Sequence, residues 1–290
     1  LILDKGTDQT YKLTVNSSDY SFFRLFGANT SGADITNPVA TNANPNLKKA
    51  LWIRTGTLVL QGFTVIPSLS EGTCNGAPNS DFYIPANGGL VIDGSNVIVL
   101  ATADDYNEVN LAYTVAGGTG LVNGINQGAC SSLSILGKLQ INDGYFSTRE
   151  SGGLITWDFA SGQLEINGGT ADVKQFRAAG GASGLGSYLQ TGGTFIVRGR
   201  FQSTTSSFTA VTDLASAPLN YNRATDGSLD GAVGSFNLNA TTNVFAMSGG
   251  TIKIYDACGV GGRVFDVLSS AGNINVTGGT IEFIPTTGIS

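Results

Sequence analysis

Short runs of alternating apolar and polar residues recur along the chain, and a glycine-containing turn separates the two runs of each pair. The clearest copy is residues 274–283 (INVTGGTIEF), and two others are residues 245–254 (FAMSGGTIKI) and 164–173 (LEINGGTADV). Alternation of this kind predicts a strand with one face directed inward. Glycine at the turn supplies backbone angles that a Cβ atom forbids, and asparagine or threonine beside it can bond the local backbone or stack in ladders. Each copy therefore predicts two short strands joined by a tight corner.

The copies recur at a spacing typical of a solenoid. Looser copies lie at residues 51–60, 90–99 and 139–148, while residues 188–197 fit the pattern only in their second half. The cleanest turns, at positions 142, 167 and 191, are 25 and then 24 residues apart. Such units bury their apolar face only against the next unit in a stack. At about 25 residues per coil the chain predicts roughly eleven coils and a rod on the order of 50 Å long. Inserted loops would reduce this length.

We therefore expect an all-β chain folded as a right-handed parallel β-helix with loop insertions. In such a stack, equivalent residues of successive coils lie one above another. The sequence therefore predicts columns of inward-facing residues. The outward positions are expected to carry Asp172, Lys253 and Glu282, and Ile196 breaks that rule. An antiparallel β-sandwich also has short strands and glycine-rich turns, but the recurrence of one corner motif favours the β-helix. The two inward columns are Ala171, Phe195, Ile252 and Ile281, and Val173, Val197, Ile254 and Phe283.

The domain organisation follows from where the repeat is interrupted. Residues 1–50 are expected to form an irregular first coil or a cap, and residues 51–290 the repeats. Insertions are expected at about 61–88, 100–136 and 202–234. The chain starts at Leu1 and stops in mid-pattern, so we expect a piece of a longer protein.

Composition narrows the classes of protein. Charged residues make up 12% of the 290, against the usual quarter or so, while 41% are hydrophobic, so intrinsic disorder is disfavoured. The chain has no histidine, which excludes Ser-His-Asp catalysis and histidine-ligated zinc. A net charge of −6 makes a nucleic-acid groove improbable. No apolar run approaches the roughly 18 residues needed to span a membrane.

Two of the three cysteines, Cys74 and Cys130, lie in glycine-rich insertions between successive copies. Stacking brings such insertions together, so we expect a disulfide and hence an oxidising, extracytoplasmic site. Two buried free thiols are the alternative. Cys258 has no assigned partner.

Candidate catalytic residues are sparse. Asp104-Asp105 is the only pair of adjacent aspartates, and the G-H-G and R-x-K elements of polygalacturonase-like sites are absent. The run 226–231 (DGSLDG) lacks the fuller ligand spacing of a calcium loop. We therefore predict no enzymatic activity, no metal and no cofactor. Tyr106 and Trp157 are candidate carbohydrate contacts, with packing under a loop as the alternative.

The Gly-Gly-Thr corners, as in 248–254 (SGGTIKI), resemble those of bacterial surface β-helix proteins. More narrowly, residues 138–198 are similar to stretches of very large secreted adhesins of Bacteroidota, including gliding-motility adhesins exported by the type IX system. The resemblance, over about residues 88–284, implies a repetitive, extracellular, cell-surface protein that binds surfaces or polysaccharide. Its partners are then surface polysaccharide or other cell-surface ligands, flanking domains of the same chain, and secretion or anchoring machinery. A carbohydrate-active β-helix enzyme and a trimeric phage tail-spike-like fibre are the alternatives.

Overall fold

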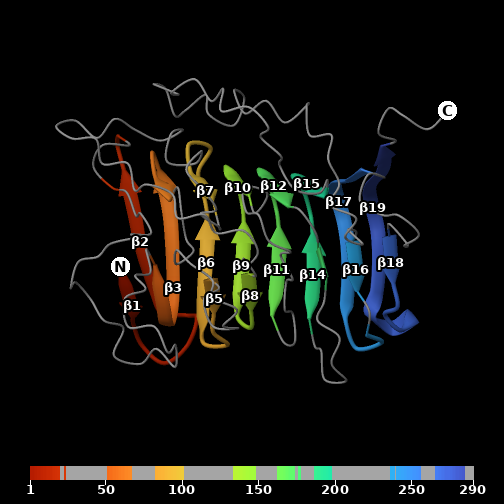
Figure 1. Cartoon of the computed structure of the whole chain (residues 1–290), viewed down its shortest axis with the longest axis horizontal. Helices are drawn as coiled ribbons and strands as arrows, with labels where there is room; N and C mark the ends of the chain where they lie inside the picture. Colours follow the sequence, from red (N-terminus) through yellow and green to blue (C-terminus); the bar gives the residue numbers. More distant parts are fainter. Residues whose placement is uncertain are drawn as a thin grey trace, which may run out of the picture.

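Eight strands stack side by side in one sheet, which we call the front sheet (Figure 1). The structure is a computed structural model that describes residues 1–19, 23, 51–66, 82–100, 133–147, 162–173, 176–177, 186–197, 236–238, 240–255 and 265–284. In stacking order the front strands are β2 (Lys12–Ser17), β3 (Trp52–Gly62), β6 (Gly88–Ile92), β9 (Lys138–Ile141), β11 (Gln163–Ile166), β14 (Ser187–Gln190), β17 (Val244–Tyr255) and β19 (Ile274–Ile284).

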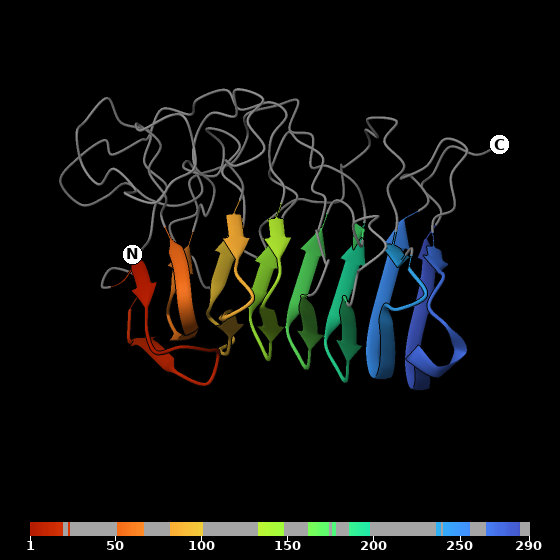
Figure 2. The ribbon, with the colours of Figure 1, turned by 90° about the horizontal axis from the view of Figure 1, so that it is seen from below.

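Front strands turn at a corner into a second sheet, and the corners lie side by side along the stack (Figure 2). β17 and β19 run through their corners as single long strands, so they belong to both sheets. The other strands of the second sheet are β4 (Val65–Ile66), β7 (Ile98–Leu100), β10 (Tyr145–Ser147), β12 (Thr170–Val173) and β15 (Thr194–Val197).

Short strands add further pairings to the same stack. β1 (Ile2–Asp4) pairs with the first residues of β3, and β5 (Phe82–Ile84) pairs with β8 (Leu133–Ile135). β13 (Phe176–Arg177), β16 (Phe236–Leu238) and β18 (Phe265–Val267) form a three-stranded sheet. A 3-10 turn, η4 (Ala271–Asn273), leads into β19. Strands therefore occur at 65–66, 82–84 and 133–135, within the ranges expected to be insertions.

Every strand pairing among the described residues is parallel. This confirms the parallel β-helix and excludes the antiparallel sandwich for this part of the chain. Seven spacings between eight front strands make the stack about 34 Å long at about 4.8 Å per spacing. The sequence estimate of eleven coils was too high for the described residues, because segments between strands are often longer than a coil requires.

The predicted columns appear in the register. Ala171 pairs with Phe195, Phe195 with Ile252, and Ile252 with Ile281; the second column continues in the same way from Val173 to Phe283. The first three residues of each column are buried, while Ile281 is half-buried and Phe283 is exposed, because β19 is the last of the described strands in the stack. The copy at 188–197 fits over its whole length, since Tyr188 and Gln190 of β14 pair in register with both neighbours.

One outward position was predicted wrongly. Asp172 is fully buried, although its neighbours in the same outward column are not: Ile196 is half-buried and Glu282 is exposed. The hydroxyl of Tyr145, on the coil before, donates a hydrogen bond of 3.4 Å to Asp172 Oδ2. A tyrosine of the preceding coil thus reaches this carboxylate, where the alternation alone predicted contact with solvent.

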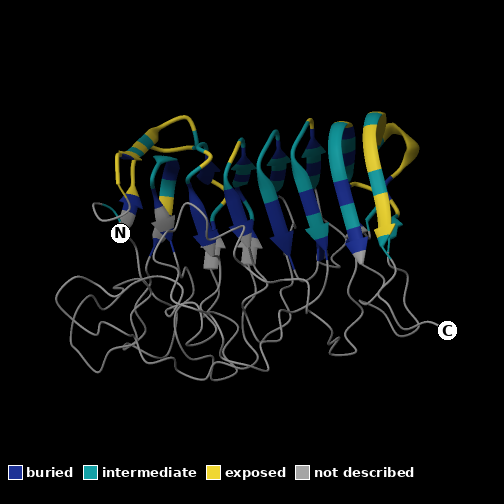
Figure 3. Cartoon of the chain, turned by 90° about the horizontal axis from the view of Figure 1, so that it is seen from above, coloured by how far each residue is buried: buried dark blue, intermediate teal, exposed yellow. Residues whose placement is uncertain are grey.

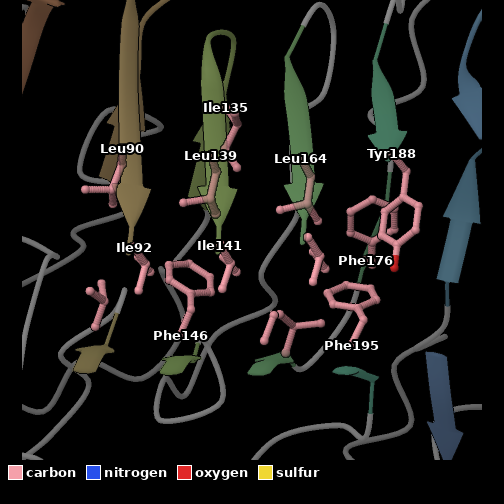
Figure 4. Packing of buried hydrophobic residues seen from close by; sticks show 14 of the residues in the cluster. Leu90, Ile92, Ile135, Leu139, Ile141, Phe146, Leu164, Phe176, Tyr188 and Phe195 are labelled. Carbon is pink, nitrogen blue, oxygen red and sulfur yellow. The ribbon is translucent and has the colours of Figure 1, made fainter. Parts of the chain in front are cut away.

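The core is a set of columns that run through the stack (Figure 4). Leucine and isoleucine, together with Phe146, fill it near β6, β9 and β11, and a cluster of aromatic rings fills it farther along. Phe176 stacks on Phe236 with ring centroids 4.7 Å apart, and Phe236 stacks on Phe265 at 5.1 Å. Each fully buried aliphatic side chain contributes about 1.5–3 kcal/mol, so this column packing is the main source of stability.

Candidate ligand-binding face

A hydrogen-bonded row of polar side chains crosses five coils on the outward side of the front sheet, where each strand meets its corner. We call this row the amide ladder; its members are Gln61, Asp93, Asn142, Asn167 and Thr191. These residues fall one position after the last inward residue of their front strands, so the alternation turns all of them outward. The parallel register then brings them one above another.

The bonds of the amide ladder converge on one carboxylate. Thr191 Oγ1 donates to Asn167 Oδ1 at 2.7 Å, and Asn167 Nδ2 donates to Asn142 Oδ1 at 3.0 Å. Asn142 Nδ2 donates to Asp93 Oδ1 at 2.9 Å, and from the other side Gln61 Nε2 donates to Asp93 Oδ2 at 2.7 Å. A chain of aligned bonds polarises its members, so the carboxylate of Asp93 strengthens the row.

A second cluster flanks the amide ladder on β9 and β11. Lys138 Nζ lies 2.6 Å from Glu165 Oε2, and Asn167 Nδ2 donates to Glu165 Oε1 at 2.8 Å. Gln163 Nε2 donates to Glu165 Oε2 at 3.1 Å, and Gln140 Nε2 donates to Asn142 at 2.7 Å. This group links the outward faces of two neighbouring strands to the ladder.

The ionisation of Glu165 follows from these contacts. Burial raises the pKa of its carboxyl group, but the hydrogen bond from Lys138, the bond from Asn167, the positive charge of Lys138 and the bond from Gln163 outweigh burial and hold the pKa below its ordinary value of 4.5. Glu165 is thus an ionised carboxylate at neutral pH, whereas a general acid for glycoside cleavage needs a raised pKa. In this cluster Glu165 therefore acts as a hydrogen-bond acceptor.

A column of threonines lies on the opposite side of the corners. Thr170, Thr194, Thr251 and Thr280 pair in register across four coils of the second sheet. The threonine column and the amide ladder share two coils, in which the glycine pairs 168–169 and 192–193 separate Asn167 from Thr170 and Thr191 from Thr194. These two corners therefore present an amide or a hydroxyl on one side and a threonine on the other.

The site residues predicted from sequence do not fall on this face. Cys74, Tyr106, Cys130 and Trp157 lie outside the described residues, as do Cys258 and the acidic pair Asp104-Asp105. The disulfide and the two aromatic carbohydrate contacts stay predictions. Asparagine beside the corner did signal a ladder, but the outward cluster around Glu165 was missed. Its signal was the polar identity of every outward residue on two neighbouring strands, Lys138 and Gln140, then Gln163 and Glu165.

Neither a metal cluster nor a spanning helix occurs in the part of the chain that the structure describes. No group of three or more Cys, Asp or Glu side chains there is arranged to hold a metal ion. The same residues contain no helix with the length and apolarity needed to cross a bilayer. Comparison of the chain with protein-family models, with curated proteins and with solved structures found no match.

Proposed function

We propose that this chain is a structural and adhesive segment of a large extracellular bacterial surface protein, and that the amide ladder contacts polysaccharide. The observation that carries the proposal is a continuous row of amide, carboxylate and hydroxyl groups, repeated coil by coil along a stiff stack. Sugar hydroxyls both donate and accept hydrogen bonds, and amides offer both functions at one side chain. A repeated row therefore suits a repeated sugar chain.

The low charge of the molecule favours many weak contacts rather than one deep binding pocket. Each neutral hydrogen bond contributes about 0.5–1.5 kcal/mol net, so one coil alone binds poorly. When several coils bind one polymer, each contact after the first is intramolecular, so the overall affinity exceeds that of a single coil. The resemblance of residues 138–198 to stretches of Bacteroidota adhesins supports the cell-surface part of the proposal, namely attachment of a cell to a surface, including during gliding.

Retention of the chain on immobilised polysaccharides, scored together with cleavage, tests this proposal. The double variant Gln61→Ala/Thr191→Ala removes the two terminal donors of the amide ladder, and we expect retention to weaken about tenfold. The matched control is Thr170→Ala/Thr194→Ala, which removes two hydroxyls from the other side of the corners. We expect the control to bind like the wild type.

Two results would contradict the proposal. One is a ladder variant, shown to be folded by its thermal transition, that binds every retained polysaccharide as tightly as the wild type. The other is release of new reducing or unsaturated ends by the wild type that Asp104→Asn or Asp105→Asn abolishes. That second result favours a β-helix enzyme.

A further inference from the structure

The amide ladder has a direction, and the carboxylate of Asp93 sets it. A carboxylate only accepts hydrogen bonds, so Gln61 and Asn142 must both turn their amide NH2 groups toward Asp93. The side-chain carbonyl of Asn142 then faces Asn167 and accepts from it, and the side-chain carbonyl of Asn167 accepts from Thr191. Every bond of the row therefore points toward one acidic residue.

The hydrogen-bond donors at the Thr191 end of the ladder are already in use. Asn167 donates both N–H groups of its amide, one to Asn142 and one to Glu165. Thr191 donates its hydroxyl hydrogen to Asn167. Asn142 Oδ1 accepts twice, from Asn167 and from Gln140, which fills both of its lone pairs. Capacity to bind a ligand therefore lies toward the other end of the row.

The open hydrogen-bonding groups gather on three neighbouring coils. Among the described residues Asp93 accepts one bond at each oxygen, although a carboxylate has about four acceptor sites. Gln61 and Asn142, on either side of it, each have a second amide N–H that no described residue accepts. All three side chains are partly exposed, as are the corners of the middle coils in Figure 3. Open acceptor sites thus lie between two open donors.

The charge of this face restricts the ligand further. Lys138 is the one basic residue on β9 and β11, and its ammonium group lies 2.6 Å from Glu165 Oε2, which neutralises that carboxylate. No basic side chain in the described part of the chain pairs with Asp93. A polymer of uronic acids would bring its own carboxylates against this charge, and like charges across an interface cost affinity. An uncharged polymer meets no such repulsion.

We propose that the ligand of the amide ladder is an uncharged polysaccharide, and that hydroxyl groups of its sugars bind the Asp93 carboxylate between Gln61 and Asn142. This ligand class rests on the proposed function, in which the ladder contacts polysaccharide. A sugar hydroxyl donates its hydrogen to Asp93 and accepts the second N–H of Gln61 or Asn142, so it uses both kinds of open group. An ionised carboxylate or sulfate has no hydrogen to donate. Because the row crosses the strands, the polymer lies along the stack.

Retention of the wild type by matched neutral and acidic polymers tests the proposal. A uronic acid is a hexose whose exocyclic CH2OH group is oxidised to a carboxylate, so galactan with polygalacturonate and mannan with polymannuronate form matched pairs. At low ionic strength we expect the neutral member of a retained pair to bind about tenfold more tightly than the acidic member. Salt at about 1 M should narrow this difference, because it screens the repulsion.

Asp93→Asn tests the carboxylate itself. Asparagine has nearly the same shape but lacks the charge and offers fewer acceptor sites, so retention of neutral polymers should weaken about tenfold. The preference for neutral over acidic polymers should also shrink. Asp143→Asn is the matched control, because it removes the same charge from the corner of the next coil. Asp143 is exposed and accepts a bond from the N–H of Gly144, outside the ladder. The control should bind neutral polymers like the wild type.

Equal or tighter retention by the acidic member of a pair at low ionic strength would overturn the proposal, while polysaccharide binding itself would stand. The same conclusion follows if Asp93→Asn, shown to be folded by its thermal transition, binds neutral polymers like the wild type. Should that variant be unfolded, the wild-type comparison of matched polymers decides alone. Retention by no polymer at all would overturn both this proposal and the proposed function.

Discussion

In the Gly-Gly corners, the two adjacent glycines serve different purposes. Gly193 has φ of +64°, and Gly169 and Gly250 at the equivalent positions have +61° and +78°, which is the left-handed region that other residues adopt at a cost. Gly192 has ordinary angles, but a Cβ atom there would overlap the carbonyl oxygen of Asn167 in the coil before. The first glycine therefore permits close stacking and the second permits the turn.

The glycine corner gives a direct prediction. Gly193→Ala forces a side chain into the left-handed region and against the backbone of Gly168, so we expect the free energy of unfolding to fall by about 1–3 kcal/mol. Gly272→Ala is the control, because no atom lies within 4 Å of a Cβ built there, and its effect should stay within about 0.5 kcal/mol. Urea denaturation followed by circular dichroism measures both. Equal losses in the two variants would contradict the role given to the corner.

Alternation in the sequence predicts the direction of a side chain but not its surroundings. Gln190 shows this limit, because it occupies an inward column between Ile166 and Met247 and is buried. The hydroxyl of Tyr188 donates to its Oε1 at 2.8 Å, and its Nε2 donates to the Gly192 carbonyl at 3.1 Å. Buried polar groups need such partners. Tyr188 and Gln190 looked like departures from the repeat because their partners come from packing that the sequence does not display.

At the scale of strands, β9 and β11 are joined by side chains as well as by their backbone. Glu165 accepts bonds from Lys138, Gln163 and Asn167, and so ties the outward faces of two coils together. Its pKa is lowered in the folded chain. A carboxyl group of this kind adds stability above its ordinary pKa of 4.5, and that stability is lost as the pH falls through the folded value.

The contribution of Glu165 should therefore depend on pH. Wild type should exceed Glu165→Gln in stability near pH 7, and the difference should shrink as the pH is lowered below 4.5. Lys138→Gln should weaken that pH dependence, since it removes the charge and hydrogen bond that favour the carboxylate. Melting temperatures from pH 3 to pH 7 check both expectations. A constant difference between wild type and Glu165→Gln across this range would refute the account.

The strands themselves were the most predictable part of the molecule. Copies 164–173, 245–254 and 274–283 were identified from alternation and the Gly-Gly corner, and all three lie in parallel register. The same pattern missed β5, β8 and β13, because two- and three-residue strands are too short to show a period. The amide ladder was half-predictable: asparagine at the corner indicated it, but the partners of each amide depend on the stacking order.

At the scale of the whole molecule, position along the stack decides what a side chain contributes. Ile166 and Val276 lie in the same inward column, three coils apart. Ile166 has register partners on both sides and is fully buried, whereas Val276 is 52% exposed and, among the described residues, pairs only with Met247. A solenoid is stabilised by contacts between adjacent coils, so its ends are weaker than its middle.

Truncation of one side chain in the middle of this column and of another in its last coil tests whether the ends are weaker than the middle. Ile166→Ala should lower the free energy of unfolding by about 2–5 kcal/mol, as expected for a buried isoleucine. Val276→Ala should cost about 0.5 kcal/mol or less, because this side chain is half-exposed. Guanidinium denaturation gives both values. A loss at Val276 as large as that at Ile166 would mean that the end coil is packed like the middle.

The shared strand direction has a mechanical consequence. Hydrogen bonds between neighbouring coils run along the long axis of the stack, as the strand pairings show. Tension applied between the first and last coils therefore loads those interfaces in series, and the weakest interface sets the force at which the molecule opens. Tension applied across one coil, along its strands, loads many bonds of that coil in parallel. The molecule should therefore withstand a much larger force applied along the strands of one coil than a force that pulls its first and last coils apart.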